Sequence, residues 1–205
     1  MTGYRPLERY GLIGNLEACA LVGDDGSIDW CCFPHLESPS VFAKIPDAEE
    51  GGHFSIRPTD EHESSQSYVD RTNVLETTFE TNSGAVTITT FMPVFGVEDD
   101  DVPKQTIFRR VSCTSGSLSV DVAFRPRFDH ARAETAVGVI DGGVLSTADV
   151  PRGDSAGTAE EKAFLSGDLD WAEGRAKLRR RSTSTRATRT GSSSVTANRR
   201  RSPTT

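Results

Sequence analysis

The sequence lacks the long apolar run that a membrane-spanning segment needs. A helix that crosses a bilayer takes about 20 consecutive apolar residues, and no stretch of the 205 residues approaches that length. The opening residues, Met1 to Arg5, also lack the apolar core of a secretory signal. These absences predict a cytoplasmic protein with no membrane partner.

Cysteine is scarce as well. The four cysteines are Cys19, Cys31, Cys32 and Cys113, none of them in a CxxC pair, and no histidine stands at metal-ligand spacing from them. Neither a disulfide framework nor a zinc site is therefore indicated. We expect reduced, mostly buried thiols that pack as small apolar side chains, and no metal or cofactor.

Positive charge is sparse over most of the chain and concentrated at one end. Residues 1–171 hold 13 Lys and Arg against 29 Asp and Glu, a balance of −16, whereas residues 172–205 hold 10 basic residues and 1 acidic residue. The acidic excess would repel nucleic acid and anionic lipid. Two interpretations stay open: adaptation to a high-salt, halophilic cytoplasm, or an ordinary solvated surface.

The basic segment, residues 172–205, cannot build a core, because from Arg175 onward it has 13 Ser or Thr and no acidic residue. We expect it to be disordered. Nucleic-acid binding is disfavoured, since no aromatic residue alternates with the basic ones and the attached body is acidic. The abrupt change also prompts a frameshift hypothesis: codons permitted for residues 182–199 can be read one base earlier as an acidic stretch followed by a strand-like one.

Residues 1–171 have the periodicity of β-strands. Residues 73–81 and 85–92 show rough alternation of β-branched and aromatic residues around a turn, which predicts a hairpin. Residues 106–113 and 118–124 predict a second hairpin in the same way. In the latter, alternation places four residues on one core-facing side: Leu118, Val120, Val122 and Phe124.

Three shorter strands are predicted earlier in the chain, at residues 20–22, 28–33 and 53–57, the first two joined by the turn at residues 24–26. One helical turn is predicted at residues 40–44, where Pro39 fits the first turn and Ser38 can supply the cap oxygen. Strands at this spacing predict a mainly β fold, an antiparallel β-sandwich.

The segment from Tyr10 to Ala43 carries a resemblance to a known family. It includes YGLIGN at residues 10–15, DGSIDW at residues 25–30 and SPSVFA at residues 38–43. This pattern resembles the opening of glycoside hydrolase family 15 proteins, which are glucoamylase-like or trehalase-like. The resemblance continues at lower density and fades near Trp171. The chain departs from the pattern where His35, Leu36 and Glu37 replace the family's usual Arg, Phe and Asp.

The resemblance implies a two-domain enzyme: an amino-terminal β-sandwich of the supersandwich type, here residues 1–171, followed by a six-hairpin α/α barrel. In the family, two glutamates of the barrel hydrolyse an α-glucosidic bond with inversion, one as acid and one as base. No position of this chain matches either glutamate, so no catalytic residue is carried over. The chain alone is expected to be inactive, and its α-glucan or α-glucoside substrate to bind through the missing barrel.

Carboxylates within the chain offer no substitute for that acid and base. Asp29, Glu37, Asp129 and residues 99–101 are candidates by type, but their spacing places no two of them across a sugar-sized gap. We expect Asp29 and Ser27 to be hydrogen-bond partners at a turn or strand edge, and residues 99–101 to form a solvated loop.

Three side chains could border the mouth of a substrate pocket that the barrel completes: Trp30, His35 and Glu37. Trp30 lies within the densest part of the family pattern, and an aromatic face can stack on a sugar. Core packing is its alternative role. His35 and Glu37 would hydrogen-bond sugar hydroxyls, but like His130 they are also ordinary surface residues by type.

Three functions therefore compete. The chain is the amino-terminal fragment of an α-glucoside hydrolase, which we favour. Alternatively, it is a stand-alone module that binds glucan or pairs with a separately encoded catalytic domain. In the third, the basic tail binds nucleic acid.

Overall fold

The computed structural model describes residues 4–94, 105–141, 143–151, 157–167, 170–172, 175–179 and 192–201. Apart from one short 3-10 helix, η1 (Leu7–Arg9), every regular element in these ranges is a β-strand. All strand pairs are antiparallel and fall into two sheets. The mainly β prediction is therefore confirmed.

The first sheet has the order β1-β2-β3-β5-β10-β15-β14, with β4 paired to β3. Its strands are β1 (Tyr10–Gly14), β2 (Cys19–Gly23), β3 (Ser27–Cys32), β4 (Ser40–Ala43), β5 (His53–Pro58), β10 (Ser119–Arg125), β14 (Asp170–Ala172) and β15 (Arg175–Arg179).

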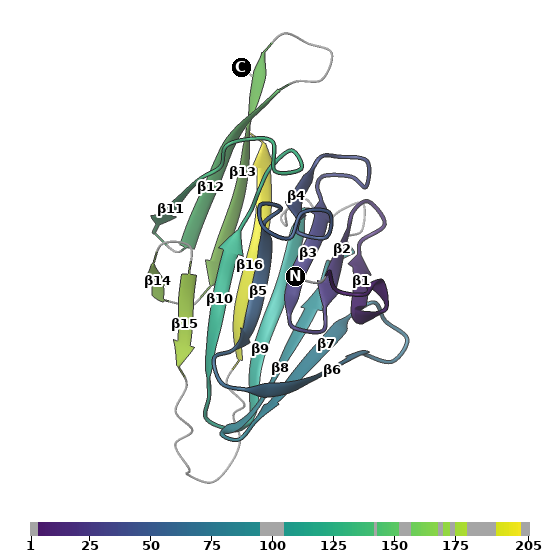
Figure 1. Cartoon of the computed structure of the whole chain (residues 1–205), viewed down its shortest axis with the longest axis vertical. Coiled ribbons are helices and arrows are strands. Elements are labelled where there is room, and N and C mark those ends of the chain that lie inside the picture. The colour runs from purple at the N-terminus through teal and green to yellow at the C-terminus, as the bar shows by residue number, and fades with distance from the viewer. Residues whose placement is uncertain are drawn as a thin grey trace.

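The second sheet has the order β11-β12-β13-β16-β9-β8-β7-β6. Its strands are β6 (His62–Tyr68), β7 (Leu75–Thr81), β8 (Gly84–Phe91), β9 (Thr106–Gly116), β11 (Ala136–Ile140), β12 (Gly143–Pro151), β13 (Thr158–Gly167) and β16 (Ser192–Arg201). Figure 1 shows the two sheets as layers, with β3 and β5 of the first sheet in front of β9 and β16 of the second.

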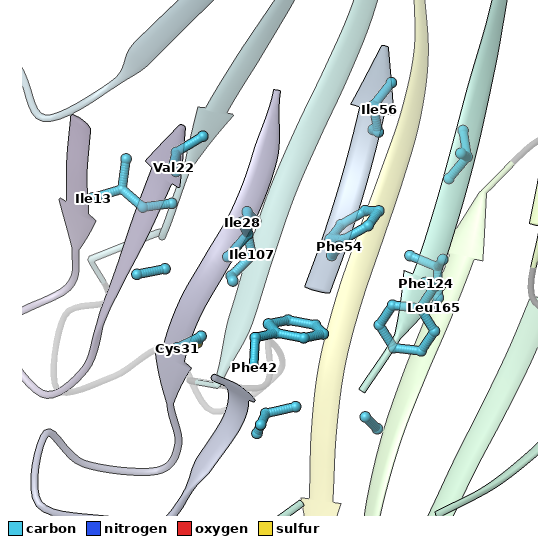
Figure 2. Packing of buried hydrophobic residues seen from close by; sticks show 14 of the residues in the cluster. Ile13, Val22, Ile28, Cys31, Phe42, Phe54, Ile56, Ile107, Phe124 and Leu165 are labelled. Carbon is cyan, nitrogen blue, oxygen red and sulfur yellow. The ribbon is translucent and has the colours of Figure 1, made fainter. Parts of the chain in front are cut away.

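The core lies between the layers, as expected of a sandwich whose strands alternate apolar and polar residues. Ile28 and Phe54 from the first sheet belong to the same buried cluster as Ile107 and Leu165 from the second, and Figure 2 shows these side chains in the space between the sheets. Phe124 packs edge-on against Phe54, with 5.7 Å between the ring centroids.

Most predicted strands are confirmed. The hairpin predicted at residues 73–92 is the β7–β8 pair, closed by the turn that precedes Gly84. The pair joined by residues 24–26 is β2–β3. The predicted core side of residues 118–124 is also confirmed: Val120, Val122 and Phe124 are buried, and Leu118 packs partly buried against the cluster.

Two local predictions are wrong. The helical turn predicted at residues 40–44 is instead strand β4, which is buried throughout because it pairs with β3 and presents Val41 and Phe42 to the core. The second predicted hairpin does not form, because β9 pairs with β8 and β16 whereas β10 pairs with β5 and β15. The chain crosses from one layer to the other after Gly116.

The tail expected to be disordered, residues 172–205, has strand backbone in two places, β15 and β16. β15 pairs with β10, and β16 lies between β13 and β9. The main-chain N–H and C=O groups of an open strand edge pair with any extended segment, whatever its side chains, so composition does not predict such pairing. Most other residues of the tail lie outside the described ranges, and both the boundary at residue 171 and the frameshift hypothesis stay predictions.

None of the described residues forms a helix with the length and hydropathy needed to cross a lipid bilayer.

Candidate functional site

The segment from Tyr10 to Ala43 forms β1 to β4, and a buried carboxylate, Asp29, holds its strands together. Asp29 is 2% exposed. It accepts hydrogen bonds from the Tyr10 hydroxyl at 2.8 Å and from the Ser27 hydroxyl at 2.5 Å. Lys44 Nζ lies 3.4 Å from its other side. A buried carboxylate with these partners is stabilised as an anion, which fits the structural role predicted for Asp29 and Ser27.

The N-terminal residues add a second ion cluster beside the first. Arg5 forms an ion pair with Asp25 and lies 3.8 Å from Asp29. Burial alone would raise the pKa of Asp25, but the hydrogen bond and charge of Arg5 lower it below its ordinary value. Burial, followed by the hydrogen bond to Asp29, raises the pKa of Tyr10.

A fully buried arginine ties this segment to the second sheet. Arg109 of β9 reaches across the core and donates hydrogen bonds to the carbonyl oxygens of Gly26, at 2.6 Å, and Phe54, at 3.0 Å. Its guanidinium also lies 4.7 Å from the centre of the Phe54 ring. Burial lowers the pKa of Arg109 to about 9, with the charges of Asp25 and Asp29 opposing that shift. The guanidinium therefore remains charged at pH 7 and anchors the turn at Gly26.

Trp30 lies outside this core. It is half-buried, does not belong to the buried cluster, and stacks on the His130 ring with 6.1 Å between centroids. The Nδ1 atom of His130 is in turn 3.0 Å from the hydroxyl of Ser40 on β4. The core role considered for Trp30 is therefore not what the structure shows.

His130 is exposed, as expected of a surface histidine, but its contact with Trp30 was not predicted from the sequence. It sits in a run of three residues with left-handed backbone: Asp129, His130 and Ala131 have φ angles of 54°, 56° and 65°. Such conformations cost about 1 kcal/mol each for residues other than glycine, and they persist where surrounding contacts fix them. The stacking on Trp30 and the bond to Ser40 are two such contacts.

His35 and Glu37 are exposed in the loop between β3 and β4. The loop is held by a hydrogen bond from the His35 N–H to the Ser38 hydroxyl and one from the Ser38 N–H to the His35 carbonyl. Within residues 4–94 no hydrogen bond, ion pair or ring contact joins Trp30 to either side chain. The structure thus places the three predicted pocket-edge residues in neighbouring elements without bringing them into direct contact.

The other candidate carboxylates are dispersed. Asp129 forms an ion pair with Arg132 at 2.6 Å, and residues 99–101 lie outside the described ranges. Three further carboxylates, Glu134, Asp149 and Glu160, line an open hollow of about 380 Å³ beside β11. All three are exposed, and Lys162 lies 2.9 Å from Glu160.

Metal binding has no candidate in the part of the chain that the structure describes, since no three His, Cys, Asp or Glu side chains there are grouped to hold an ion. The four cysteines form no disulfide with one another: Cys31 and Cys32 are buried, whereas Cys19 and Cys113 are partly exposed. Burial raises the pKa of the Cys19 thiol, which disfavours the reactive thiolate.

Comparison with known proteins gives a family match over nearly the whole chain. Residues 2–194 match the family model described as "Trehalase-like, N-terminal", so the match extends past Trp171, where the resemblance read from the sequence fades. No solved structure matches the chain.

Several curated relatives are similar to part of the chain. It is 32% identical to a trehalase of Thermoplasma volcanium over 150 residues, which cover 72% of this chain and 24% of the relative. It is 48% identical to Trehalase 1 of Sulfolobus acidocaldarius over 95 residues, or 46% of this chain and 16% of the relative. A trehalase of Mycolicibacterium smegmatis is 28% identical over 63% of this chain and 21% of its own length. The chain thus spans about a quarter or less of each of these relatives.

Proposed function

Because the chain belongs to the trehalase-like N-terminal domain family, we propose that it is the non-catalytic amino-terminal domain of a hydrolase that acts on α-glucosidic bonds. The proposal rests on one observation: the family model matches most of this chain, whereas the chain aligns with only a small part of each trehalase. The family match takes in residues 2–194, yet the alignments cover only 24% and 16% of the trehalases of Thermoplasma volcanium and Sulfolobus acidocaldarius. Most of such an enzyme lies in another domain.

The side chains of the described residues support this division of labour. An inverting hydrolase needs a carboxylic acid and a carboxylate about 6.5 to 9.5 Å apart on either side of the glycosidic bond. The one deeply buried aspartate, Asp29, is already bound by Tyr10, Ser27 and Lys44. The proposed acid and base therefore belong to the second domain, an α/α barrel.

In the assembled enzyme we place Trp30, His35 and Glu37 at the border of the substrate pocket, with His35 and Glu37 free to hydrogen-bond sugar hydroxyls because both are exposed. The substrate is an α-glucoside in the cytoplasm. No cofactor takes part in this proposal, because inversion at the anomeric carbon needs only the two carboxyl groups and water.

The gene offers the test. We propose that the catalytic domain is encoded downstream and that the tail, residues 172–205, comes from a shifted reading frame. Sequencing about a kilobase of the gene beyond the stop codon should reveal a frame for a large helical domain. An uninterrupted frame for residues 172–205, with codons incompatible with the shifted translation, would remove the frameshift. Absence of any helical domain downstream would refute the proposed function.

One observation favours a second candidate, a glucan-binding module: the half-buried Trp30 lies outside the core. Retention of the purified chain on insoluble starch, abolished by Trp30→Ala, would support it. For the basic tail, salt-dependent retention of DNA that disappears on deleting residues 175–205 would indicate nucleic-acid binding, which we do not expect.

A further inference from the structure

The outer face of the first sheet carries apolar side chains where a sandwich normally presents polar ones. Leu12 of β1 is directly opposite Leu21 of β2, and Leu21 is directly opposite Trp30 of β3. Directly opposed residues of antiparallel strands project from the same face of the sheet. None of the three belongs to the core cluster, so this apolar stripe, Leu12–Leu21–Trp30, faces away from the core.

The outer face of the second sheet is polar along β7 and the first part of β8. There, Thr78 of β7 is opposite Thr87 of β8, with their hydroxyls 3.0 Å apart, and Thr89 donates a hydrogen bond of 3.2 Å to Glu76. These residues alternate with the buried Phe79 and the other core positions of the same strands. Further along, this face also carries an apolar pair, Phe91 of β8 opposite Phe108 of β9, but the two rings stack with 5.4 Å between their centroids and both are half-buried. Leu12, Leu16 and Leu36, in contrast, are each more than half exposed.

The stripe is flanked at one end by two exposed leucines in loops. Leu16, in the turn between β1 and β2, is 93% exposed and has a left-handed φ of 74°. Leu36, in the loop after β3, is 59% exposed, and its N–H donates to the carbonyl of Glu17 next to Leu16. A left-handed backbone conformation is unfavourable for leucine, and the exposed Leu16 side chain makes too little contact within the domain to offset that cost. The side chain is therefore available to contact a surface outside the domain.

The chain's own loops cover the outer face elsewhere. Across β3 from Leu21, Trp30 is opposite Ala43, which is buried and bonded through its N–H to the Gly51 carbonyl. On β2, the side chain of Arg5 lies over Gly23, where an added Cβ would be 1.6 Å from the guanidinium. Within β1 to β4 the stripe is thus most open at Leu12, which is 52% exposed, whereas Leu21 and Trp30 are half-buried.

We propose that the apolar stripe, together with Leu16 and Leu36, is the surface on which the second domain of the hydrolase docks; this rests on the proposed function. The occupant is a protein surface with leucine-sized pockets, supplied by the large part of the relatives that this chain does not cover. Leucines neither stack on a sugar nor hydrogen-bond to it, and the one aromatic residue already has His130 against its ring. The exposed carboxylate Glu17, next to Leu16, would be complemented by a basic residue at the edge of the partner surface.

A chimaeric enzyme tests the docking surface. Residues 2–171 of this chain, which precede the proposed frameshifted tail, replace the matching amino-terminal part of Trehalase 1 of Sulfolobus acidocaldarius, and kcat/KM for trehalose is measured. Leu12→Asp and Leu16→Asp should each lower kcat/KM about tenfold or more, the effect of a buried interface residue. The matched control is Val139→Asp, a strand residue that is 49% exposed on β11, at the opposite side of the molecule (Figure 1). It should change kcat/KM less than about twofold.

The outcomes separate the two proposals. An unsubstituted chimaera without activity, beside active Trehalase 1, would overturn the proposed function and this inference with it. An active chimaera in which Leu12→Asp and Leu16→Asp behave like Val139→Asp would overturn the docking surface alone. Misfolding is distinguished by urea unfolding of the isolated variants, which should match the unsubstituted chain because the substituted side chains are exposed.

Other occupants would also be recognised. If the isolated chain is a dimer that Leu16→Asp dissociates, a second copy covers the stripe and the docking proposal is wrong. If the isolated chain is retained on starch through Trp30, the stripe binds glucan, and the docking proposal is again wrong. A monomer that starch does not retain, with the expected loss of activity in the chimaera, supports the second domain as the partner.

Discussion

His53 should make the domain less stable in mild acid, and the size of the effect follows from its surroundings. It opens β5, opposite Arg125 on β10. Burial, together with the positive charges of Lys44, Arg125 and Arg57 and against the charge of Asp29, lowers its pKa from 6.5 to about 4. The folded state therefore resists protonation that the unfolded chain accepts readily.

The sign and magnitude follow from linkage. Above pH 6.5 the imidazole is neutral in both states and contributes no pH dependence. As the pH falls from 6.5 toward 4, only the unfolded state gains the proton, so the free energy of unfolding decreases. The loss attributable to His53 is about 1 kcal/mol at pH 5.5 and about 2 to 2.5 kcal/mol at pH 4.5.

Urea unfolding of the chain and of His53→Gln, at pH 7.5, 6.5, 5.5 and 4.5, measures this contribution. The variant should lose less stability than the unsubstituted chain over this range, by the amounts above, because all other titrating groups are shared. His35→Gln, which removes an exposed loop imidazole, is the matched control and should keep the steeper dependence. Equal pH slopes for the chain and for His53→Gln would refute the reasoning.

Three further substitutions are checked by the same unfolding measurement at pH 7.5. Gly26→Ala should destabilise by about 2 kcal/mol or more, since φ is +76° and the new Cβ would lie 2.2 Å from the Ile56 carbonyl oxygen; a change below 0.5 kcal/mol would contradict the turn geometry. Asp29→Asn should cost about 3 kcal/mol because Lys44 and Arg5 lose a buried anion; an unchanged midpoint would show that the carboxylate is dispensable. Trp30→Ala should cost only about 1 kcal/mol, against about 3 to 5 for Phe54→Ala in the core; equal losses would place Trp30 in the core.

Local features of the fold were predictable from sequence, and non-local ones were not. The β7–β8 hairpin follows from alternation on both sides of a short turn, which is information held within 20 or so residues. The strand that pairs with β10 cannot be predicted from such local information. Alternation correctly predicts that Val120, Val122 and Phe124 face the core, but it does not predict that β10 joins the first sheet whereas β9 belongs to the second. Choosing a partner strand depends on long-range packing.

Simple alternation along β3 also fails to predict the face of the sheet on which Trp30 lies. A strict alternation of faces every two residues would place Ile28, Trp30 and Cys32 on one side of β3. The structure instead buries Ile28 and Cys31 in the core, because the register shifts between Leu21 and Val22 on the facing strand. One extra residue in a strand reverses the side of every residue beyond it. The same irregularity leaves Asp29 turned toward Tyr10 and Ser27.

The candidate site was only partly predictable. The Tyr10–Ala43 pattern located the right segment, and Trp30, His35 and Glu37 belong to it. Trp30 and His130 are 100 positions apart in the sequence but stack on each other. Neither residue composition nor the alternation of apolar residues along the strands indicates that contact. Leu16 had a weak local signal, an apolar residue between Asn15 and Glu17 at a turn, where polar residues are usual.

We propose that this chain supports hydrolysis by a second domain and does not itself cleave a glycosidic bond. The direct measurement is glucose release from trehalose and from maltose by the purified 205-residue chain, with Trehalase 1 of Sulfolobus acidocaldarius as the positive control. The account predicts no release above the buffer blank, even at high protein concentration and long incubation. Turnover at an ordinary enzymatic rate, about 1 per second or faster, that co-purifies with the chain would contradict it.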